Sequence, residues 1–243
     1  WYVDPDATGG DDGSSWADAY QDFAGFQTAL DDGTDEDFNT TIYVRLSTSS
    51  TFDMGASDQL DLGIGGTPST TNPTANNWLK IIACHAGGTE VDPKPITVAD
   101  RGTYVTIKAT GDPTVMVKYS EAIDRVAWYG FKFDGNNGTA TNGFKVTSSD
   151  AARSEFHLFV NCCFDDADDN SCYFDSNRRG MKFIDCDFLA TSQVSKSNPE
   201  ALYNATFIRC NFKSNYYQSV RYVGALGCLF LYCVFDPQGA QYC

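Results

Sequence analysis

Two aspartates and an arginine carry the side chains best suited to chemistry in this sequence. Asp185 and Asp187 are two residues apart, and Arg209 follows Asp185 by one period of the repeat described below. In an extended strand, residues two apart lie on one face with their Cα atoms roughly 7 Å apart. Paired carboxylates at such a separation are compatible with glycoside hydrolysis. The alternative interpretation is an ordinary cross-strand ion pair between Asp185 and Arg209.

An acidic segment offers a second candidate site. Four carboxylates lie close together directly after Phe164, and they belong to Asp165, Asp166, Asp168 and Asp169. Hard cations prefer clustered oxygen ligands, so these residues could bind Ca²⁺. Aspartate also favours turns for local reasons, so a solvated turn without a metal is the alternative.

A group of tyrosines is the third candidate. Tyr216, Tyr217 and Tyr222 lie close together in the sequence, between two copies of the same repeat. A tyrosine offers a flat apolar face with a polar tip, which suits contacts with carbohydrate or with another protein. Packing within a turn of the fold is the alternative role for these three side chains.

The elements that position these residues are marked by an internal repeat. Four copies of Phe-aliphatic-x-Cys-x-Phe begin at Phe159, Phe183, Phe207 and Phe230, at a nearly constant spacing. A repeat of about 24 residues, at roughly 3.3 Å per residue, is long enough for three short strands and three turns. The repeat therefore predicts an all-β solenoid, a parallel β-helix in which each copy forms one rung.

Weaker strand signals precede the four copies. A copy without the cysteine covers 128–133, and residues 41–44, 78–83 and 103–107 are typical of strands without the full motif. Residues 53–77 are rich in glycine, proline and small polar residues and are predicted to form a long loop.

Alternation with period two predicts which side chains of each copy face the core. The aliphatic residue, the cysteine and the second phenylalanine share one face, which we expect to point inward. Stacking then produces an internal column of Cys162, Cys186, Cys210 and Cys233. Buried thiols behave as small apolar groups, so this column is predicted to be packing and not a redox or metal site. Any disulfides are expected among the other five cysteines.

The amino-terminal residues differ from the repeats and are predicted to close one end of the solenoid. Ser15 and Asp18 fit a capping box, and apolar residues recur at helical spacing over residues 16–30. We therefore expect an amphipathic helix there, whose apolar face covers the core of the first rung. The chain then divides into an entry strand and capping helix at 1–40 and a parallel β-helix at 41–243, within a single domain.

The charge balance narrows the set of partners. The 243 residues include 32 acidic and 17 basic side chains, so the net charge is −15. Such a surface repels phosphate backbones and anionic lipid, so neither nucleic-acid binding nor membrane insertion is expected. The sequence begins at Trp1 without a methionine or a basic leader, as a mature chain would after removal of a signal peptide or as a trimmed chain would. We expect a secreted protein at a cell or virion surface.

The residues quoted so far resemble a known family. The segments Tyr2 to Pro5 and Thr8 to Ala17, followed by the Cys/Phe solenoid, are similar to right-handed parallel β-helix proteins of the pectate-lyase-like superfamily. The opening is particularly similar to large secreted bacterial surface proteins and to virus-encoded spike or fibre proteins. The resemblance covers nearly the whole chain for its fold, but the superfamily includes lyases, hydrolases, adhesins and structural fibres.

The enzymes of that superfamily imply an acidic site for polysaccharide on one outward sheet. There Asp185 and Asp187 would supply the carboxylates, and Arg209 could act as a base beside a calcium-bound uronate. The hydrolases also imply an Asn-Thr-Asp, an Asp-Asp and a Gly-His-Gly element on successive rungs, and neither His85 nor His157 stands in such a context. We therefore predict a non-catalytic extracellular structural or binding protein, a β-helix subunit of a surface fibre, filament, adhesin or virion spike. A polysaccharide lyase or glycoside hydrolase is the alternative, and a calcium-stabilised passive scaffold is a third hypothesis.

The carboxy-terminal end of the solenoid is expected to make contacts with other molecules. Eight residues follow Phe235, and they contain no amphipathic segment that could cover the final rung. An uncovered solenoid end exposes apolar core and strand edges. Either the natural chain continues beyond Cys243, or this end docks on another subunit. In the second case we expect self-association through this end into a homo-oligomer or a filament, with polysaccharide as the other expected partner.

Overall fold

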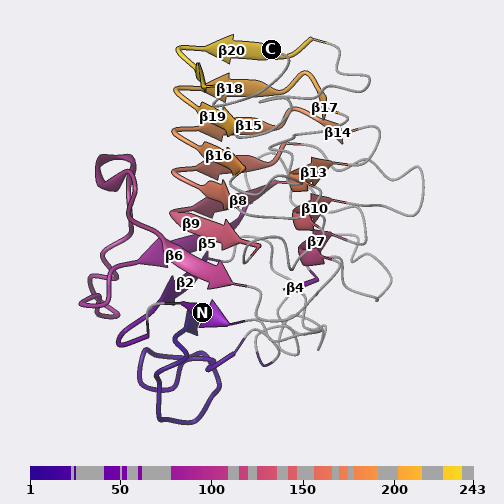
Figure 1. Ribbon diagram of the computed structural model, residues 1–243. Coiled ribbons are helices and arrows are strands. Elements are labelled where there is room, and N and C mark those ends of the chain that lie inside the picture. The colour runs from indigo at the N-terminus through magenta and orange to yellow at the C-terminus, as the bar shows by residue number, and fades with distance from the viewer. Residues whose placement is uncertain are drawn as a thin grey trace.

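The computed structural model describes residues 1–22, 25, 41–49, 51–53, 60–61, 78–108, 115–119, 125–135, 142–146, 156–165, 170–174, 178–190, 202–214 and 227–236. Almost all regular structure in these residues is β-strand (Figure 1). The strands stack in sequence order from the amino-terminal end of the molecule to the carboxy-terminal end. This arrangement of parallel sheets is compatible with a β-helix-like solenoid.

Two long sheets receive one strand from each rung, and all strand pairs among the described residues are parallel. Sheet A has the order β1 (Tyr2–Val3), β2 (Thr41–Arg45), β5 (Leu79–Cys84), β8 (Val126–Tyr129), β11 (Leu158–Val160), β15 (Lys182–Ile184), β18 (Thr206–Ile208), β20 (Leu229–Leu231). Sheet B has the order β21 (Val234–Asp236), β19 (Asn211–Ser214), β16 (Asp187–Ala190), β12 (Cys163–Asp165), β9 (Phe131–Asp134), β6 (Val105–Lys108), β3 (Phe52–Asp53).

A third side of the stack carries shorter sheets. Sheet C has the order β13 (Asn170–Phe174), β10 (Asn142–Val146), β7 (Val115–Tyr119), β4 (Leu60–Asp61), and β14 (Arg178–Arg179) pairs with β17 (Leu202–Tyr203). One short 3-10 helix, η1 (Val98–Asp100), lies in the connection between β5 and β6. Strand β4 falls within the region predicted to be a long loop, most of which lies outside the described residues.

The strand register follows the sequence repeat. Phe183 of β15 lies opposite Phe159 of β11 and Phe207 of β18, and Phe207 lies opposite Phe230 of β20. The predicted rungs are therefore confirmed as neighbouring parallel strands. The weaker strand predictions upstream are confirmed as β2, β5, β6 and the pair β8 and β9, with ends shifted by one or two residues.

Each copy of the repeat is bent at its third residue, which corrects the prediction that the aliphatic residue faces the core. Asn161, Asp185 and Arg209 have φ angles of 49°, 54° and 52°, in the left-handed region. This corner separates the strand of sheet A from the strand of sheet B and resets the alternation of side chains. The first phenylalanine is therefore fully buried, whereas the aliphatic residue, such as Ile184, lies on the outer face and is partly exposed.

A second corner with left-handed backbone precedes the strands of sheet A. It recurs at Arg125, Phe156, Gly180, Asn204 and Gly227, with φ angles between 53° and 77°. Glycine and asparagine tolerate this conformation, and bulky side chains rarely adopt it. Arg125 and Phe156 are therefore the strained members of this column.

Two columns of phenylalanine rings fill the core. In the first, the Phe183 and Phe207 rings stack with a centroid distance of 4.8 Å and an interplanar angle of 4°. In the second, Phe188 and Phe212 stack at 4.8 Å and 2°. The columns meet edge to face, with 5.4 Å between the ring centroids of Phe183 and Phe188. Both geometries are favourable for aromatic rings, so each rung fixes the ring positions of the next.

The cysteine column is confirmed as part of the core. Cys162, Cys186 and Cys210 are fully buried free thiols, and Cys233, the fourth member of the predicted column, is a partly buried one that packs against the core. The Sγ of Cys186 donates to the carbonyl oxygen of Phe159 on the preceding rung at 3.5 Å. Burial raises the pKa of Cys186 well above its ordinary value, so the thiol stays neutral. These contacts agree with a packing role.

Residues 16–22 of the predicted amino-terminal helix are not helical. They adopt turns and bends, with a β-bridge at Tyr20, and of residues 23–30 the structure describes only Gly25, which is helical. The capping contact itself is present as an isolated turn, in which the backbone N–H of Asp18 donates to the Ser15 Oγ at 3.1 Å. Helical hydrogen bonds are lost because the carbonyl oxygens are used elsewhere: Ala17 accepts from Gly9, and Asp18 accepts from residues 12 and 13.

These turns nevertheless cover the amino-terminal end of the core. Tyr20 forms a parallel bridge with Val3 of β1, and its ring stacks on Trp1 with 5.8 Å between centroids. Trp16 is 4% exposed and lies under the guanidinium of Arg45. The predicted cap is therefore present in this region, but it is made of turns.

Candidate functional site

The three candidate catalytic residues lie together at the corner between sheets A and B. Asp185 occupies the left-handed corner itself, and Asp187 is the first residue of β16. The two aspartates therefore do not share the face of one strand, which corrects the prediction. Arg209 occupies the same corner one rung further, as predicted from the repeat spacing.

Asp185 and Arg209 form a two-pronged ion pair. The Nε of Arg209 donates to Oδ1 of Asp185 at 2.8 Å, and its second guanidinium nitrogen donates to Oδ2 at 2.6 Å. Asp185 is 5% exposed, so this carboxylate is held almost entirely by protein groups. The hydrogen bonds and the charge of Asp185 raise the pKa of Arg209. This is the cross-strand ion pair that the repeat spacing allowed.

Asp187 is held by three further side chains. Its Oδ1 accepts from Arg101 at 2.8 Å and from Asn211 at 2.7 Å, and its Oδ2 accepts from the Tyr104 hydroxyl at 2.8 Å. Burial raises the pKa of Tyr104, with further contributions from Cys163 and then Asp187, so the phenol remains a donor. The carboxylate therefore accepts a hydrogen bond on both oxygens.

Arg101 connects two rungs at once. Besides Asp187, it donates to the backbone carbonyl of Arg209 at 3.0 Å and lies 3.6 Å from Oδ1 of Asp185. We call Arg101, Tyr104, Asp185, Asp187, Arg209 and Asn211 the corner cluster. Asn211 follows Asp187 by one period of the repeat, so the repeat spacing could have identified it; Arg101 and Tyr104 come from a distant connection with no repeat signal.

The connection that supplies Arg101 and Tyr104 runs over the corners at Gly130, Asn161, Asp185 and Arg209. The Asn161 side-chain amide donates to the carbonyl oxygen of Thr97 at 3.3 Å. A Cβ on Gly130 would lie 2.9 Å from the side chain of Ile96, so this corner admits only glycine beneath the connection. The corner cluster therefore fastens residues 85–104 to successive rungs. Its hydrogen bonds and ion pairs join groups of the chain to one another, as those of a structural clamp do.

The acidic segment is only partly described. Asp165 is 7% exposed and lies 2.8 Å from the Nζ of Lys132, which also lies 3.4 Å from Asp134. Burial opposes the charge of Lys132, but its hydrogen bond to Asp165 and the nearby carboxylates raise its pKa. Among the described residues, no group of three or more His, Cys, Asp or Glu could hold a metal ion. Asp166, Asp168 and Asp169, and with them the predicted calcium site, lie outside the described residues.

Tyr216, Tyr217 and Tyr222 also lie outside the described residues. Their predicted role in contacts with carbohydrate or protein remains a prediction. Of the five cysteines outside the column, Cys84, Cys163 and Cys228 are free thiols, so no disulfide joins them.

Among the described residues, the last rung, Leu229–Asp236, exposes several large apolar side chains side by side. Leu229, Val234 and Phe235 are 49%, 56% and 48% exposed. The equivalent phenylalanine on the two preceding rungs, Phe212 and Phe188, is fully buried. Among the described strands, β20 ends sheet A (Figure 1) and β21 ends sheet B, so both are edge strands.

Within the described residues, no helix is long and apolar enough to cross a membrane. Comparisons with protein-family models, with curated proteins and with solved structures found no match for this chain.

Proposed function

We propose that this chain is a non-catalytic structural and binding protein that associates through its last rung. The finer fold in this proposal is a right-handed parallel β-helix of the pectate-lyase-like kind. The proposed setting is extracellular, as a subunit of a surface fibre, adhesin or virion spike. The net charge of −15 supports a setting away from nucleic acid and anionic lipid.

The observation that carries the proposal is the exposed end of the phenylalanine column. The Phe235 ring stacks on Phe212 with 4.9 Å between centroids, and its exposure is 48% where buried members of the column have none. Burying an apolar side chain of this size is worth roughly 1.5–3 kcal/mol. Strand edges add hydrogen-bonding groups that favour pairing with another chain. The last rung therefore has the composition of an interface.

The partner that we propose is a second copy of this chain, joined end to end. At the other end of the solenoid, the described edge of sheet A is already paired, because Tyr20 bridges Val3 and its ring stacks on Trp1. A head-to-tail filament would need that edge to be open. Two copies that meet last rung to last rung about a two-fold axis need only the surface that is exposed. Apolar rings and strand edges then face their own equivalents.

An enzyme function is not part of the proposal. Each oxygen of Asp185 and Asp187 already accepts a hydrogen bond from an arginine, tyrosine or asparagine side chain. A substrate would have to displace those donors before either carboxylate could act on it. Activity on a polysaccharide that is lost in Asp187→Asn would contradict this argument.

Sedimentation velocity of the 243-residue protein over a range of concentrations tests the association. We expect a concentration-dependent dimer, and we expect Val234→Lys or Phe235→Lys to shift it to monomer. Val91→Lys is the matched control, because Val91 is 97% exposed and lies in the connection between β5 and β6. A monomer at all concentrations, or a dimer equally weakened by Val91→Lys, would overturn the proposal. Open-ended filaments would overturn its two-fold form.

A further inference from the structure

A lysine and two aspartates form a compact group on the outer face of sheet B, on the neighbouring strands β9 and β12. Asp134 of β9 lies opposite Asp165 of β12 by strand register, and Lys132 lies two residues before Asp134, on the same face of its strand. The Nζ of Lys132 is 2.8 Å from Oδ2 of Asp165 and 3.4 Å from Oδ2 of Asp134. One amine therefore lies within reach of two carboxylates.

Asp165 differs from the other buried aspartates on this side of the molecule. It is 7% exposed, and its Oδ1 is buried and accepts no hydrogen bond from the residues that the structure describes. Asp185 and Asp187, by contrast, accept hydrogen bonds on both oxygens. A buried carboxylate oxygen without a donor is costly, because it has lost its water and gained no partner. A reaction that removes the charge of Asp165 would relieve this cost.

An amide bond between the side chains of Lys132 and Asp165 would remove both charges. Nζ already contacts Oδ2, and Cγ, the atom that it would attack, is joined to that oxygen by one bond of about 1.2 Å. Groups that a fold holds in contact react as if they were highly concentrated, which offsets the cost of condensation in water. Burial of Asp165 also limits the access of bulk water. The neutral oxygen of the amide then costs less to bury without a donor than a carboxylate oxygen does.

We propose that Lys132 and Asp165 condense after folding into an intramolecular amide bond between neighbouring rungs, with Asp134 as the proton carrier. One proton first passes from Nζ to Oδ2 of Asp165, which leaves a neutral amine and a carboxylic acid. Nζ then bonds to Cγ, and Asp134 takes a proton from Nζ and passes it to Oδ2. The Cγ–Oδ2 bond breaks and water leaves. Asp134 ends as the carboxylate that it was, and no oxidant or reductant takes part.

The first proton transfer makes the reaction slow but does not prevent it. Burial opposes the charge of Lys132, but the hydrogen bond to Asp165 and the two nearby carboxylates raise the pKa of Lys132, so the ion pair is the resting state. The neutral pair holds the same number of protons as the ion pair, so it is reached without a change in pH. The bond should therefore form slowly in the folded protein and not during synthesis of the chain.

Intact mass spectrometry of the refolded 243-residue protein tests the bond. We expect the protein to become lighter by one water molecule in a first-order process that does not occur in urea. Trypsin should then leave residues 126–145 joined to residues 154–178, because the amide blocks cleavage after Lys132. A cyclic imide at Asp134 and Gly135 would also lose water, but it would leave Lys132 open to trypsin. An unchanged mass, or a lighter protein without the joined peptide, would overturn the proposal.

Variants distinguish the bond from an ordinary ion pair. Lys132→Gln and Asp165→Ala should each lack the joined peptide. Asp134→Ala should slow the loss of water about a hundredfold, because a positioned proton carrier contributes at least that much. Lys108→Gln is the matched control, because Lys108 lies opposite Asp134 on β6 and is partly exposed, as Lys132 is. Equal rates for Asp134→Ala and the wild type, or loss of the joined peptide in Lys108→Gln, would contradict the proposed roles.

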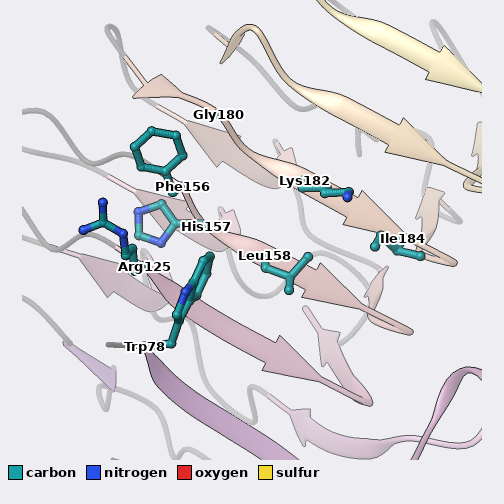
Figure 2. A pocket seen from close by; sticks show the side chains of 8 residues that line it. All are labelled: Trp78, Arg125, Phe156, His157, Leu158, Gly180, Lys182 and Ile184. Atoms are coloured by element: carbon teal, nitrogen blue, oxygen red, sulfur yellow. The ribbon is translucent and has the colours of Figure 1, made fainter. Parts of the chain in front are cut away.

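Lys182→Gln is a second control, on a different sheet. Lys182 begins β15 of sheet A and lines a pocket of about 460 Å³ together with Trp78 and Phe156 (Figure 2). This variant should form the bond at the wild-type rate, and a slower rate would mean that the loss of water depends on the fold as a whole and not on Lys132. The inference does not rest on self-association, because Lys132 and Asp165 lie outside the last rung.

Discussion

Substitutions of Asp185 test whether the corner cluster is a clamp and whether its backbone conformation matters. Asp185 accepts two hydrogen bonds from Arg209 and is 5% exposed, and its φ angle is 54°. Asp185→Asn removes the charge and keeps a side chain that tolerates this conformation. Asp185→Gly removes the side chain and relaxes the backbone. Asp185→Ala removes the side chain and leaves a Cβ in the left-handed region.

The structure sets the size and order of these effects. A hydrogen bond to a charged group contributes roughly 1.5–3 kcal/mol. Because the Asp185 carboxylate is buried while water can solvate Arg209 again, we expect loss of the hydrogen bonds of Asp185 to cost about 2 kcal/mol, near the lower end of this range. A left-handed alanine costs about 1–2 kcal/mol more than glycine. We therefore expect Asp185→Asn and Asp185→Gly to lose about 2 kcal/mol of unfolding free energy, and Asp185→Ala about 3–4 kcal/mol.

Urea unfolding followed by tryptophan fluorescence and circular dichroism measures these differences. Val91→Ala, at a position that is 97% exposed, provides the control and should change nothing. An alanine variant as stable as the glycine variant would refute the backbone argument. An asparagine variant as stable as the wild type would refute the clamp. Asp185 would then again be a candidate catalytic residue.

Three further predictions concern separate parts of the fold. Burial raises the pKa of Cys84 to about 12 from 9.0. The neutral buried thiol therefore stabilises the folded state below pH 9, and this contribution is lost as the pH rises toward 12. Alkylation at pH 9 followed by mass spectrometry should label Cys84 only in denaturant. Gly130→Ala should cost about 2–4 kcal/mol in urea unfolding, because its Cβ meets Ile96 and its φ angle is 76°, and a neutral effect would contradict the packing described for this corner. Hydrogen bonds from residues 48 and 49, led by the backbone N–H of Ser49, lower the pKa of Asp6. These hydrogen bonds therefore stabilise the folded state above the ordinary pKa of Asp6, 3.8, and the stabilisation is lost as the pH falls through the lowered pKa. An NMR titration that finds an ordinary pKa for Asp6 would contradict this prediction.

The repeat made the rungs predictable. Phe183 and Phe207 stand one period apart in the sequence, and they are stacked neighbours in the structure. The same spacing placed Arg209 beside Asp185 and Cys186 beside Cys210, because in a parallel stack one period of sequence equals one step between strands. Separation in the sequence predicts separation in space only along the stacking axis of the solenoid.

Corners and the amino-terminal cap could not be predicted in the same way. Period-two alternation predicted that Ile184 faces the core, but the left-handed backbone at Asp185 resets the alternation. The sequence pattern does not predict that an aspartate at this position has a positive φ angle. The helical spacing after Trp16 was a local signal. It was overridden by tertiary hydrogen bonds such as that from the Trp16 amide to Glu90, 2.9 Å long, which no local pattern contains.

By itself the sequence determined the stack: the rungs, their register and the aromatic and thiol columns all follow from one period, because identical side chains pack best on their own equivalents. Only the tertiary structure decided what surrounds the stack. Arg101 and Tyr104 reach Asp187 from a distant part of the sequence, and Trp78, Phe156 and Lys182 meet in one pocket from three rungs. Those contacts depend on where a connection crosses the outer face and on how each corner turns the backbone, and neither is encoded in a repeat.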